Sequence, residues 1–371
     1  MNAFADINAE QRSSAPNPEF MDRALAEAAR GVGLTSPNPA VGAVVVRNGV
    51  EIASGFHERA GEPHAEVRAL EKAGHAAHGA DLYVTLEPCS TTGRTPACTD
   101  AILRTGIRRV VVGCLDANPS HAGAGVALLR QRGVEVHVGT REEECRRINE
   151  AFFHWITTAR PLVVLKMAMT LDGRIATAGG DSKWVTGAEA RSEVQMLRKA
   201  ADAIMVGAET VRRDNPGLTV RAAPDWPRQP RRFVWTRRAA EDFPAELKIR
   251  QPGPGGDARF VQPSGRRQWR EFLTTLGADE VTMLLVEGGG TLAAELLHSE
   301  AVDKLIWFIA PKILGGNGSR PVVGGPDPLC LEESIDIAAV DISRCGRDLK
   351  YVGYPVRKRT GGDRPQPEKQ N

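Results

Sequence analysis

The sequence contains few aromatic residues and has no excess of charge of either sign. Phe, Trp and Tyr make up only 5% of the 371 residues, and 48 basic residues are balanced by 46 acidic ones, which gives a formal net charge of +2. Proteins that bind single-stranded nucleic acids use positively charged grooves lined with aromatic side chains. The composition therefore argues against a nucleic-acid partner and favours a small-molecule ligand.

Long apolar runs are also missing, and the cysteines are few. No run approaches the roughly 20 apolar residues that span a bilayer, and residues 1–17 lack the apolar core of a signal peptide. The six cysteines are far apart, whereas small disulfide-stapled domains contain them at high density. We therefore expect a soluble cytoplasmic protein with reduced thiols and no membrane partner.

The length of the chain predicts two domains, because a typical domain has about 100 to 200 residues. Apolar segments alternate with amphipathic ones throughout, which indicates an α/β fold with largely parallel sheets. In the first half we predict strands at residues 40–46, 80–86, 108–114 and 134–139, and helices at 21–31, 65–74, 98–105, 123–132 and 142–159. In the second half we predict strands at 161–169, 202–207, 231–235, 281–286 and 304–312, and helices at 189–201 and 291–299.

The domain boundary is predicted at Arg160-Pro161, where the helix over 142–159 ends before a new strand. This gives domains at 18–159 and 160–357. The segments 1–17 and 358–371 are polar and rich in turn-forming residues, so we expect mobile tails.

Three potential metal ligands follow one another in the first half. His64 lies at the start of a predicted helix with Pro63 at its first position, Cys89 follows a predicted strand, and Cys98 begins another helix, where a thiolate is favoured. One imidazole and two thiolates leave a fourth position open for water, which is the arrangement of a catalytic zinc ion. We therefore predict that His64, Cys89 and Cys98 bind zinc.

Glu66 is the predicted proton carrier of this site. Zinc lowers the pKa of a water from 15.7 to about 7, and a carboxylate that is not itself a ligand can move the proton. The order H-x-E and then P-C matches the signature of zinc nucleobase deaminases, although eight residues (90–97) separate the cysteines here instead of two. The alternative is a closed structural site with His57, His75 or His78 as fourth ligand, which would leave Glu66 without a role.

A glycine-rich turn is the clearest feature of the second half. An apolar strand ends in Glu287-Gly288-Gly289-Gly290, and an amphipathic helix follows. Backbone amides at such a turn can bind a phosphate. Three consecutive glycines do not form G-x-G-x-x-G, so the classical dinucleotide fold is not indicated, and a simple tight turn is the alternative.

Seven segments together resemble one family, the bifunctional riboflavin-biosynthesis deaminase/reductases. In the first half these are SPNPAVGAVVV (36–46), GFHERAGEPHAE (55–66) and TLEPCSTTGRTPAC (85–98). In the second half they are LKMAMTLDGRIAT (165–177), DSKWVTG (181–187), VGAETVRRDNPGLTVR (206–221) and VEGGGTLAAELL (286–297). The resemblance implies a cytidine-deaminase-like three-layer domain followed by a dihydrofolate-reductase-like domain that uses NADPH.

The resemblance also implies roles for individual residues. Glu66 would be the catalytic proton shuttle, and the zinc ligands would be His64, Cys89 and Cys98. The residues matching NADPH positions are Ala168, Trp184, Thr210, Asp214, Gly289, Gly290, Thr291, Leu292, Ala293, Ala294 and Glu295. The residues matching substrate positions are Asn38, His57, Ser182, Arg198, Leu218, Arg221 and Glu287. The two arginines of the second set are expected to bind the 5′-phosphate, and its glutamate the ribose hydroxyls.

We therefore expect hydrolytic deamination of 2,5-diamino-6-ribosylamino-4-pyrimidinone 5′-phosphate, followed by reduction of the ribosyl group to ribityl with NADPH. The main rival is a tRNA deaminase with an appended domain. The family further implies a homo-oligomer, a dimer or tetramer. Many members have an aspartate and a serine where this chain has Val234–Arg237, which leaves open whether Arg237 meets the 2′-phosphate of NADPH.

Overall fold

The computed structural model describes residues 15–357 except 94, 119, 120, 222, 224 and 254. The described chain forms two compact units. Unit 1 contains the described residues up to Pro161 together with the segment Leu276–Thr282, and unit 2 contains Leu162–Thr275 and the described residues from Met283 onward. The predicted boundary at residue 159 stays a prediction. The predicted tails lie outside the described residues apart from 15–17. Within the described chain, no helix is long and apolar enough to cross a membrane.

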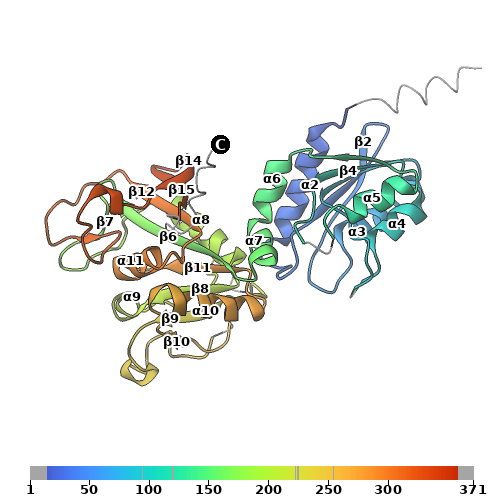
Figure 1. Ribbon diagram of the computed structural model, residues 1–371. Coiled ribbons are helices and arrows are strands. Elements are labelled where there is room, and N and C mark those ends of the chain that lie inside the picture. Colours follow the sequence, from blue (N-terminus) through green and yellow to red (C-terminus); the bar gives the residue numbers. More distant parts are fainter. Residues whose placement is uncertain are drawn as a thin grey trace, which may run out of the picture. The chain divides into compact units, whose positions relative to one another are not determined.

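Unit 1 is a three-layer structure around a five-stranded sheet of order β2-β1-β3-β4-β5. The strands are β1 (Gly42–Arg47), β2 (Val50–Phe56), β3 (Asp81–Leu86), β4 (Arg109–Cys114) and β5 (Glu135–Val138). The helices are α2 (Pro18–Gly31), α3 (Ala65–Ala73), the short 3-10 helix η1 (Gly74–Ala77), α4 (Cys98–Thr105), α5 (Ala124–Gln131), α6 (Glu142–Ile148) and α7 (Glu150–Thr158). Helices α2 and α6 cover one face of the sheet, and α3, α4 and α5 cover the other (Figure 1).

In unit 1 one strand was not predicted, and one predicted helix is wrong. Strand β2 was not expected, because its half-exposed residues lack a strong apolar pattern; it pairs antiparallel with β1 through a tight turn in which Asn48 and Gly49 both have positive φ. The helix predicted over 142–159 is interrupted at Asn149. The buried side chain of Asn149 accepts from the backbone amide of Ala40 (2.8 Å) and donates to its carbonyl (2.9 Å), and its φ of −111° is not helical.

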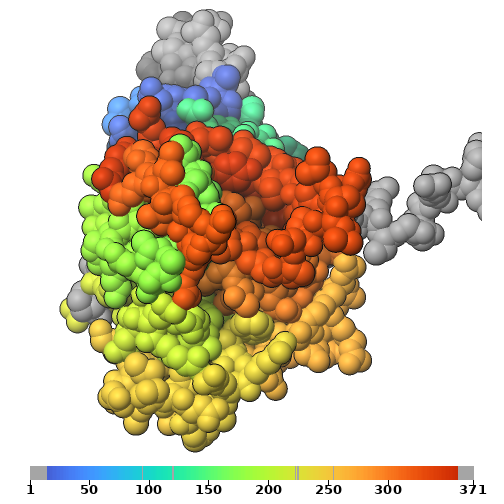
Figure 2. Space-filling model, turned by 90° about the vertical axis from the view of Figure 1, so that its left-hand side faces the viewer, coloured from blue at the N-terminus to red at the C-terminus, as the bar shows by residue number. Residues whose placement is uncertain are grey.

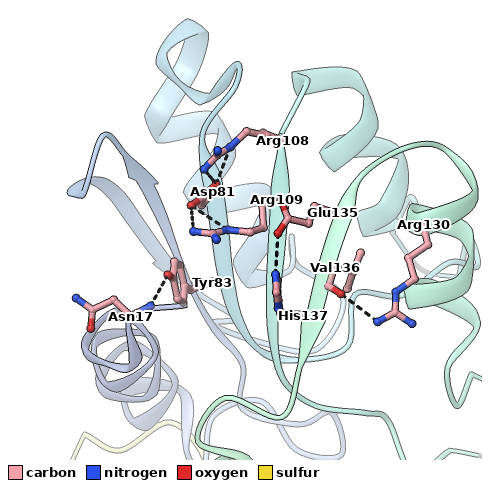
Figure 3. Close-up of polar contacts among 9 residues, drawn as sticks. All are labelled: Asn17, Asp81, Tyr83, Arg108, Arg109, Arg130, Glu135, Val136 and His137. Carbon is pink, nitrogen blue, oxygen red and sulfur yellow. Dashed lines mark hydrogen bonds and ion pairs between the residues drawn. The ribbon is translucent and has the colours of Figure 1, made fainter. Parts of the chain in front are cut away.

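A buried ion pair fixes the amino ends of the central strands (Figure 3). Asp81, the first residue of β3, is only 6% exposed and accepts from Arg108 (2.8 Å) and from Arg109 (2.5 Å). Asp81 also stands opposite Arg109 in the parallel pairing of β3 with β4. The pair therefore helps to fix the register of β3 against β4 at their amino ends.

Unit 2 contains an eight-stranded sheet of order β10-β9-β8-β11-β6-β12-β15-β14. Its strands are β6 (Leu162–Thr170), β8 (Ala203–Gly207), β9 (Arg231–Trp235), β10 (Arg259–Val261), β11 (Met283–Glu287), β12 (Lys304–Ala310), β14 (Ile337–Cys345) and β15 (Asp348–Pro355). The helices that follow β6 in the chain are α8 (Ala188–Ala200), α9 (Ala208–Asp214), α10 (Gly265–Ala278) and α11 (Gly290–His298), with 3-10 turns η2 (Ala240–Asp242) and η3 (Leu331–Glu333).

The strands from β10 to β12 run parallel, whereas β15 and β14 are added antiparallel at one edge. A separate two-stranded sheet joins β7 (Arg174–Ala176) to β13 (Arg320–Pro321), and in Figure 2 the green segment with β7 faces the viewer beside the orange-red segment with β13. Because β9, β8 and β11 are parallel, their carboxyl ends meet at one edge of the large sheet, where ligands of such sheets bind.

Candidate active sites

Three elements of unit 1 bring the predicted zinc ligands together. His64 is the residue before α3, Cys89 lies just beyond the end of β3, and Cys98 is the first residue of α4. The ligand atoms all lie within 4.8 Å of one another, with His64 Nδ1 3.1 Å from Cys98 Sγ and 3.6 Å from Cys89 Sγ. Helix α3 begins at Ala65, so Pro63 precedes the cap and does not occupy the first helical position that we predicted.

No fourth side chain joins this cluster among the residues that the structure describes. Among the alternative ligands, His57 has its ring 5.0 Å from that of His64 and directs Nε2 towards Asn38 at 3.1 Å. The arrangement therefore has the three protein ligands of a catalytic zinc site and lacks the fourth ligand of a structural one.

The side chains of His64, Cys89 and Cys98 together favour the binding of a cation. The Cys98 thiol donates a hydrogen bond to Cys89, which lowers the pKa of Cys89 to about 4; the Cys98 backbone amide also donates to Cys89, at 3.3 Å. The hydrogen bond between the two side chains and burial raise the pKa of Cys98. The hydrogen bond to Cys89 raises the pKa of His64. The protein groups alone thus hold one thiolate, and the two thiolates that we predicted require a bound cation. A borderline-soft ion such as Zn²⁺ fits this nitrogen and sulfur set.

Glu66 lies in the first turn of α3 and is 3% exposed. Burial raises the pKa of its carboxyl group, a shift that the neighbouring His64 opposes, and the carboxyl forms a hydrogen bond with Cys98. A buried carboxyl with a raised pKa, beside a metal site but outside its ligand set, can accept a proton and return it.

Asn38 and His57 form a polar pair next to this cluster. Burial, followed by repulsion from His64, lowers the pKa of His57 to about 4, so the ring is neutral near pH 7. Its Nδ1 faces the carbonyl of Pro63 at 3.3 Å, which assigns the proton to Nδ1 and leaves Nε2 to accept from the Asn38 amide. The Asn38 side chain is thereby held in one orientation.

Unit 2 contains a cavity of about 1000 Å³ at the carboxyl ends of β8, β9 and β11. Most of the residues predicted from the resemblance line it. They are Ala168, Ser182, Trp184, Arg198, Thr210, Asp214, Leu218, Arg221, Glu287, Gly289, Gly290, Thr291 and Leu292. These residues come from five separate chain segments, so the parallel sheet gathers one site from positions far apart in the sequence.

The other three predicted cofactor residues do not line this cavity. Ala293 and Ala294 are buried within α11. The Glu295 carboxylate accepts from the Trp269 indole (3.0 Å), the Gly265 backbone (2.9 Å) and the Ser299 hydroxyl (3.1 Å). The structure therefore gives Glu295 a packing role between α10 and α11, and the cavity does not support a cofactor role for these three residues.

The glycine turn before α11 depends on a close backbone approach. A Cβ added to Gly290 would lie 2.5 Å from the carbonyl oxygen of Pro321, and the amide of Gly324 donates to the Gly290 carbonyl at 3.0 Å. No side chain caps the first turn of α11, whose start belongs to the cavity wall. The free amides of this turn suit a phosphate group.

A buried charged cluster occupies the floor of the cavity. Arg198 donates to both oxygens of Glu287, at 2.6 and 3.0 Å, and to the Thr219 carbonyl at 3.0 Å, while Lys166 Nζ lies 3.8 Å from Glu287. Burial would raise the pKa of Glu287, but the two cations outweigh it and the pKa is lowered. Burial lowers the pKa of Lys166. The predicted phosphate contact of Arg198 is therefore not supported, because its guanidinium group is engaged by Glu287.

The sequence predicts no role for Lys166 and leaves that of Arg237 open. The structure places Lys166, Arg237 and Arg238 in the cavity wall. Both arginines follow β9 and are exposed, and the described residues provide neither with an ion-pair partner. A signal was present in the sequence: two consecutive basic residues one residue beyond the end of a strand in a parallel sheet.

Comparison with known proteins agrees with this two-site arrangement. A cytidine and deoxycytidylate deaminase zinc-binding region matches residues 15–114, and a RibD C-terminal domain matches residues 161–351. The riboflavin biosynthesis protein RibD of Aquifex aeolicus is 42% identical over 345 residues, covering 89% of this chain and 96% of the relative. The chain belongs to the RibD family.

Other RibD proteins support the assignment over nearly the whole chain. RibD of Escherichia coli strain K12 is 41% identical over 327 residues, covering 80% of this chain and 88% of that protein. The structure of Acinetobacter baumannii RibD superposes with a TM-score of 0.81 at 34% identity, covering 92% of this chain and 99% of that one. A diaminohydroxyphosphoribosylaminopyrimidine deaminase/5-amino-6-(5-phosphoribosylamino)uracil reductase from Thermotoga maritima gives 0.79 at 35% identity, covering 91% and 98%.

The RibD assignment confirms several predictions made from the sequence. The fold class is a cytidine-deaminase-like domain followed by a reductase domain, and the chain is a bifunctional deaminase and reductase of riboflavin biosynthesis that acts on a small-molecule pyrimidine. Its cofactors are Zn²⁺ and NADPH. The tRNA deaminase alternative is not favoured.

Proposed function

We propose that unit 1 hydrolyses the exocyclic amine of 2,5-diamino-6-ribosylamino-4-pyrimidinone 5′-phosphate, and that unit 2 reduces the ribosyl group of the product to ribityl with NADPH. The observation that carries the proposal is the cluster of His64, Cys89 and Cys98 with the buried carboxyl of Glu66 beside it. The balanced charge of the chain supports a small substrate.

In the deaminase step, zinc bound by these three ligands supplies a Lewis acid that lowers the pKa of a water to about 7. Glu66 takes a proton from the attacking water and delivers it to the ring nitrogen. It then takes the remaining proton from the new hydroxyl group, which becomes the carbonyl, and transfers it to the leaving amine. A carbon–oxygen bond forms, the carbon–nitrogen bond breaks and ammonia departs. Asn38, oriented by neutral His57, presents its amide to the pyrimidine ring.

In the reductase step, the ribosyl ring opens at its C1–oxygen bond to a hydroxyl group and a Schiff base at the amine. NADPH, when bound in the cavity of unit 2, would supply a hydride to C1 of that Schiff base, whose nitrogen takes up a proton. The glycine turn at the start of α11 would hold the diphosphate of NADPH. Arg237 and Arg238 would hold its 2′-phosphate, because both line the cavity without an acidic partner of their own among the described residues. Glu287, held by Arg198, accepts hydrogen bonds from ribose hydroxyls, and the exposed Arg221 binds the substrate phosphate.

The deaminase assignment is tested by replacing Glu66 with glutamine. We expect deamination to fall at least about 100-fold, the usual contribution of a positioned proton carrier, while bound zinc and reduction of the deaminated intermediate are retained. Glu71→Gln is the matched control, because Glu71 is exposed on the same helix α3 and should leave both activities unchanged. Wild-type deamination by a zinc-loaded Glu66→Gln protein would refute the assignment.

We also propose, from the family resemblance, that the chain forms a dimer or tetramer. The expected cytoplasmic location is a further proposal, which the widely spaced cysteines support; none of the described cysteines forms a disulfide. Sedimentation equilibrium of the full chain and cell fractionation test these two statements.

A further inference from the structure

Glu87 is a buried acid that the proposed reaction does not use. It follows the last residue of β3 and lies two residues before the ligand Cys89, and it is 6% exposed. Its carboxylate accepts from four backbone amides: Oε2 from Asp116 (3.2 Å) and Gly123 (2.9 Å), and Oε1 from Gly125 (2.9 Å) and Val126 (3.2 Å). Four backbone donors on one carboxylate hold that carboxylate rigidly.

The start of α5 explains why this acid is needed. The first amides of a helix have no partner within the helix, and a side chain of the residue before it usually accepts one of them. That residue is Gly123 here, with φ of 80°, and it has no side chain to offer. Glu87, far away in the sequence, supplies the missing acceptor, and its negative charge suits the positive end of the helix dipole.

The contact brings α5 directly onto the chain that carries Cys89. A Cβ added to Gly125 would lie 2.0 Å from the carbonyl oxygen of Pro88, so only glycine permits this approach. The backbone amide of Glu87 in turn donates to the Cys114 carbonyl at the end of β4 (3.0 Å). The peptide leading to Cys89 is thus fixed on two sides, by α5 and by β4.

We propose that Glu87 is a positioning residue of the deaminase site, which sets the place of the Cys89 sulfur through the peptide Pro88-Cys89. It acts without touching the metal or the substrate. The inference rests on the proposed zinc-dependent function. It predicts that the geometry and strength of metal binding depend on the Glu87 carboxylate even though other groups supply every ligand atom.

The test is Glu87→Gln in the full chain. Glutamine keeps the size of the side chain but replaces one acceptor oxygen by an amide NH2 group, a donor that faces the backbone donors. We expect zinc affinity, measured by competition with a chromogenic chelator, to fall about tenfold, a typical effect of a residue that supports a metal ligand. The visible absorption of the Co²⁺-substituted protein should shift, and reduction of the deaminated intermediate should stay within about twofold.

Asp81→Asn is the matched control. It removes the charge of another buried acid of unit 1, at the opposite end of the same strand (Figure 3). It should lower the unfolding temperature but leave zinc affinity and the Co²⁺ spectrum unchanged. If Glu87→Gln binds zinc like the wild type, or if Asp81→Asn loses zinc affinity to the same extent, the positioning role is refuted.

A second variant tests the proposal if the Glu87→Gln protein does not fold. Gly125→Ala pushes a methyl group against the Pro88 carbonyl and disturbs the same contact from the side of the helix. Gly125→Ala should also lower the zinc affinity, and an unchanged zinc affinity would overturn the proposal. These outcomes are distinct from failure of the proposed function, in which the wild-type protein itself would bind no zinc or would not deaminate the pyrimidine.

Discussion

Replacing Glu287 by glutamine removes one negative charge from between two buried cations. In the wild-type protein the carboxylate receives two hydrogen bonds from Arg198 and lies 3.8 Å from Lys166 Nζ, and the three side chains are at most 14% exposed. Glutamine preserves the shape but can no longer neutralise either cation. Both charges then remain in the cavity floor without a counterion.

The cost follows from the burial of this cluster. Removing one member of a buried ion pair destabilises a protein by about 3–5 kcal/mol, because the remaining charge stays desolvated. The amide can still accept one hydrogen bond from Arg198, so we take the lower value of about 3 kcal/mol. In a domain of roughly 150 to 250 residues each kcal/mol lowers the melting temperature by about 2–4 °C, which gives a loss of about 6–12 °C for the second unit.

Differential scanning calorimetry of the full chain measures this loss, and the transition of the first unit serves as internal reference. Reduction of the deaminated intermediate should fall together with stability, because Glu287 is also the proposed ribose contact, while deamination should remain unchanged. The reasoning fails if the Glu287→Gln protein melts within about 2 °C of the wild type, since the cluster would then contribute little to folding.

Three further predictions concern the metal, the cofactor and pH. Removal of zinc by a chelator should abolish deamination and lower the melting temperature of unit 1, with reduction unaffected; continued deamination by metal-free protein would contradict the site assignment. Arg237→Ala should raise the KM for NADPH about tenfold and leave the KM for NADH unchanged. An equal rise of both KM values would show that the arginine does not bind the 2′-phosphate. Because the pKa of Glu287 is lowered on folding, its stabilising effect is complete above its unfolded pKa of about 4.3 and disappears as the pH falls through the lower folded value. The stability difference between wild type and Glu287→Gln should therefore shrink below about pH 4 in urea titrations, and a constant difference would contradict this.

Local patterns in the sequence were sufficient for most of the strands and helices of unit 1. In unit 2 they predicted β6, β8, β9, β11, β12, α8 and α11 but missed β7, β10, β13, β14, β15, α9 and α10. Strands such as β4 and β8 are buried and mostly apolar, and α4 begins and ends where predicted. The same patterns could not reveal β2, because a half-exposed edge strand has no apolar signature. They also missed the break at Asn149, which depends on a contact with Ala40, more than one hundred residues away in the sequence.

The sequence by itself determined the chemistry of the first site. Spacing and residue type identified His64, Cys89, Cys98 and Glu66, because a metal site needs particular donor atoms and each donor follows a recognisable strand or helix end. The family resemblance then supplied the second site as a set of positions.

Only the tertiary structure decided what those positions do. Arg198 pairs with Glu287, Glu295 binds Trp269, and Glu87 caps a helix that starts 37 residues later, at Ala124. Each of these charged residues has the same appearance in the sequence as a solvent-exposed one. Its role is set by which partner the fold places within hydrogen-bonding distance in a buried environment, and that partner lies on a different element of the chain.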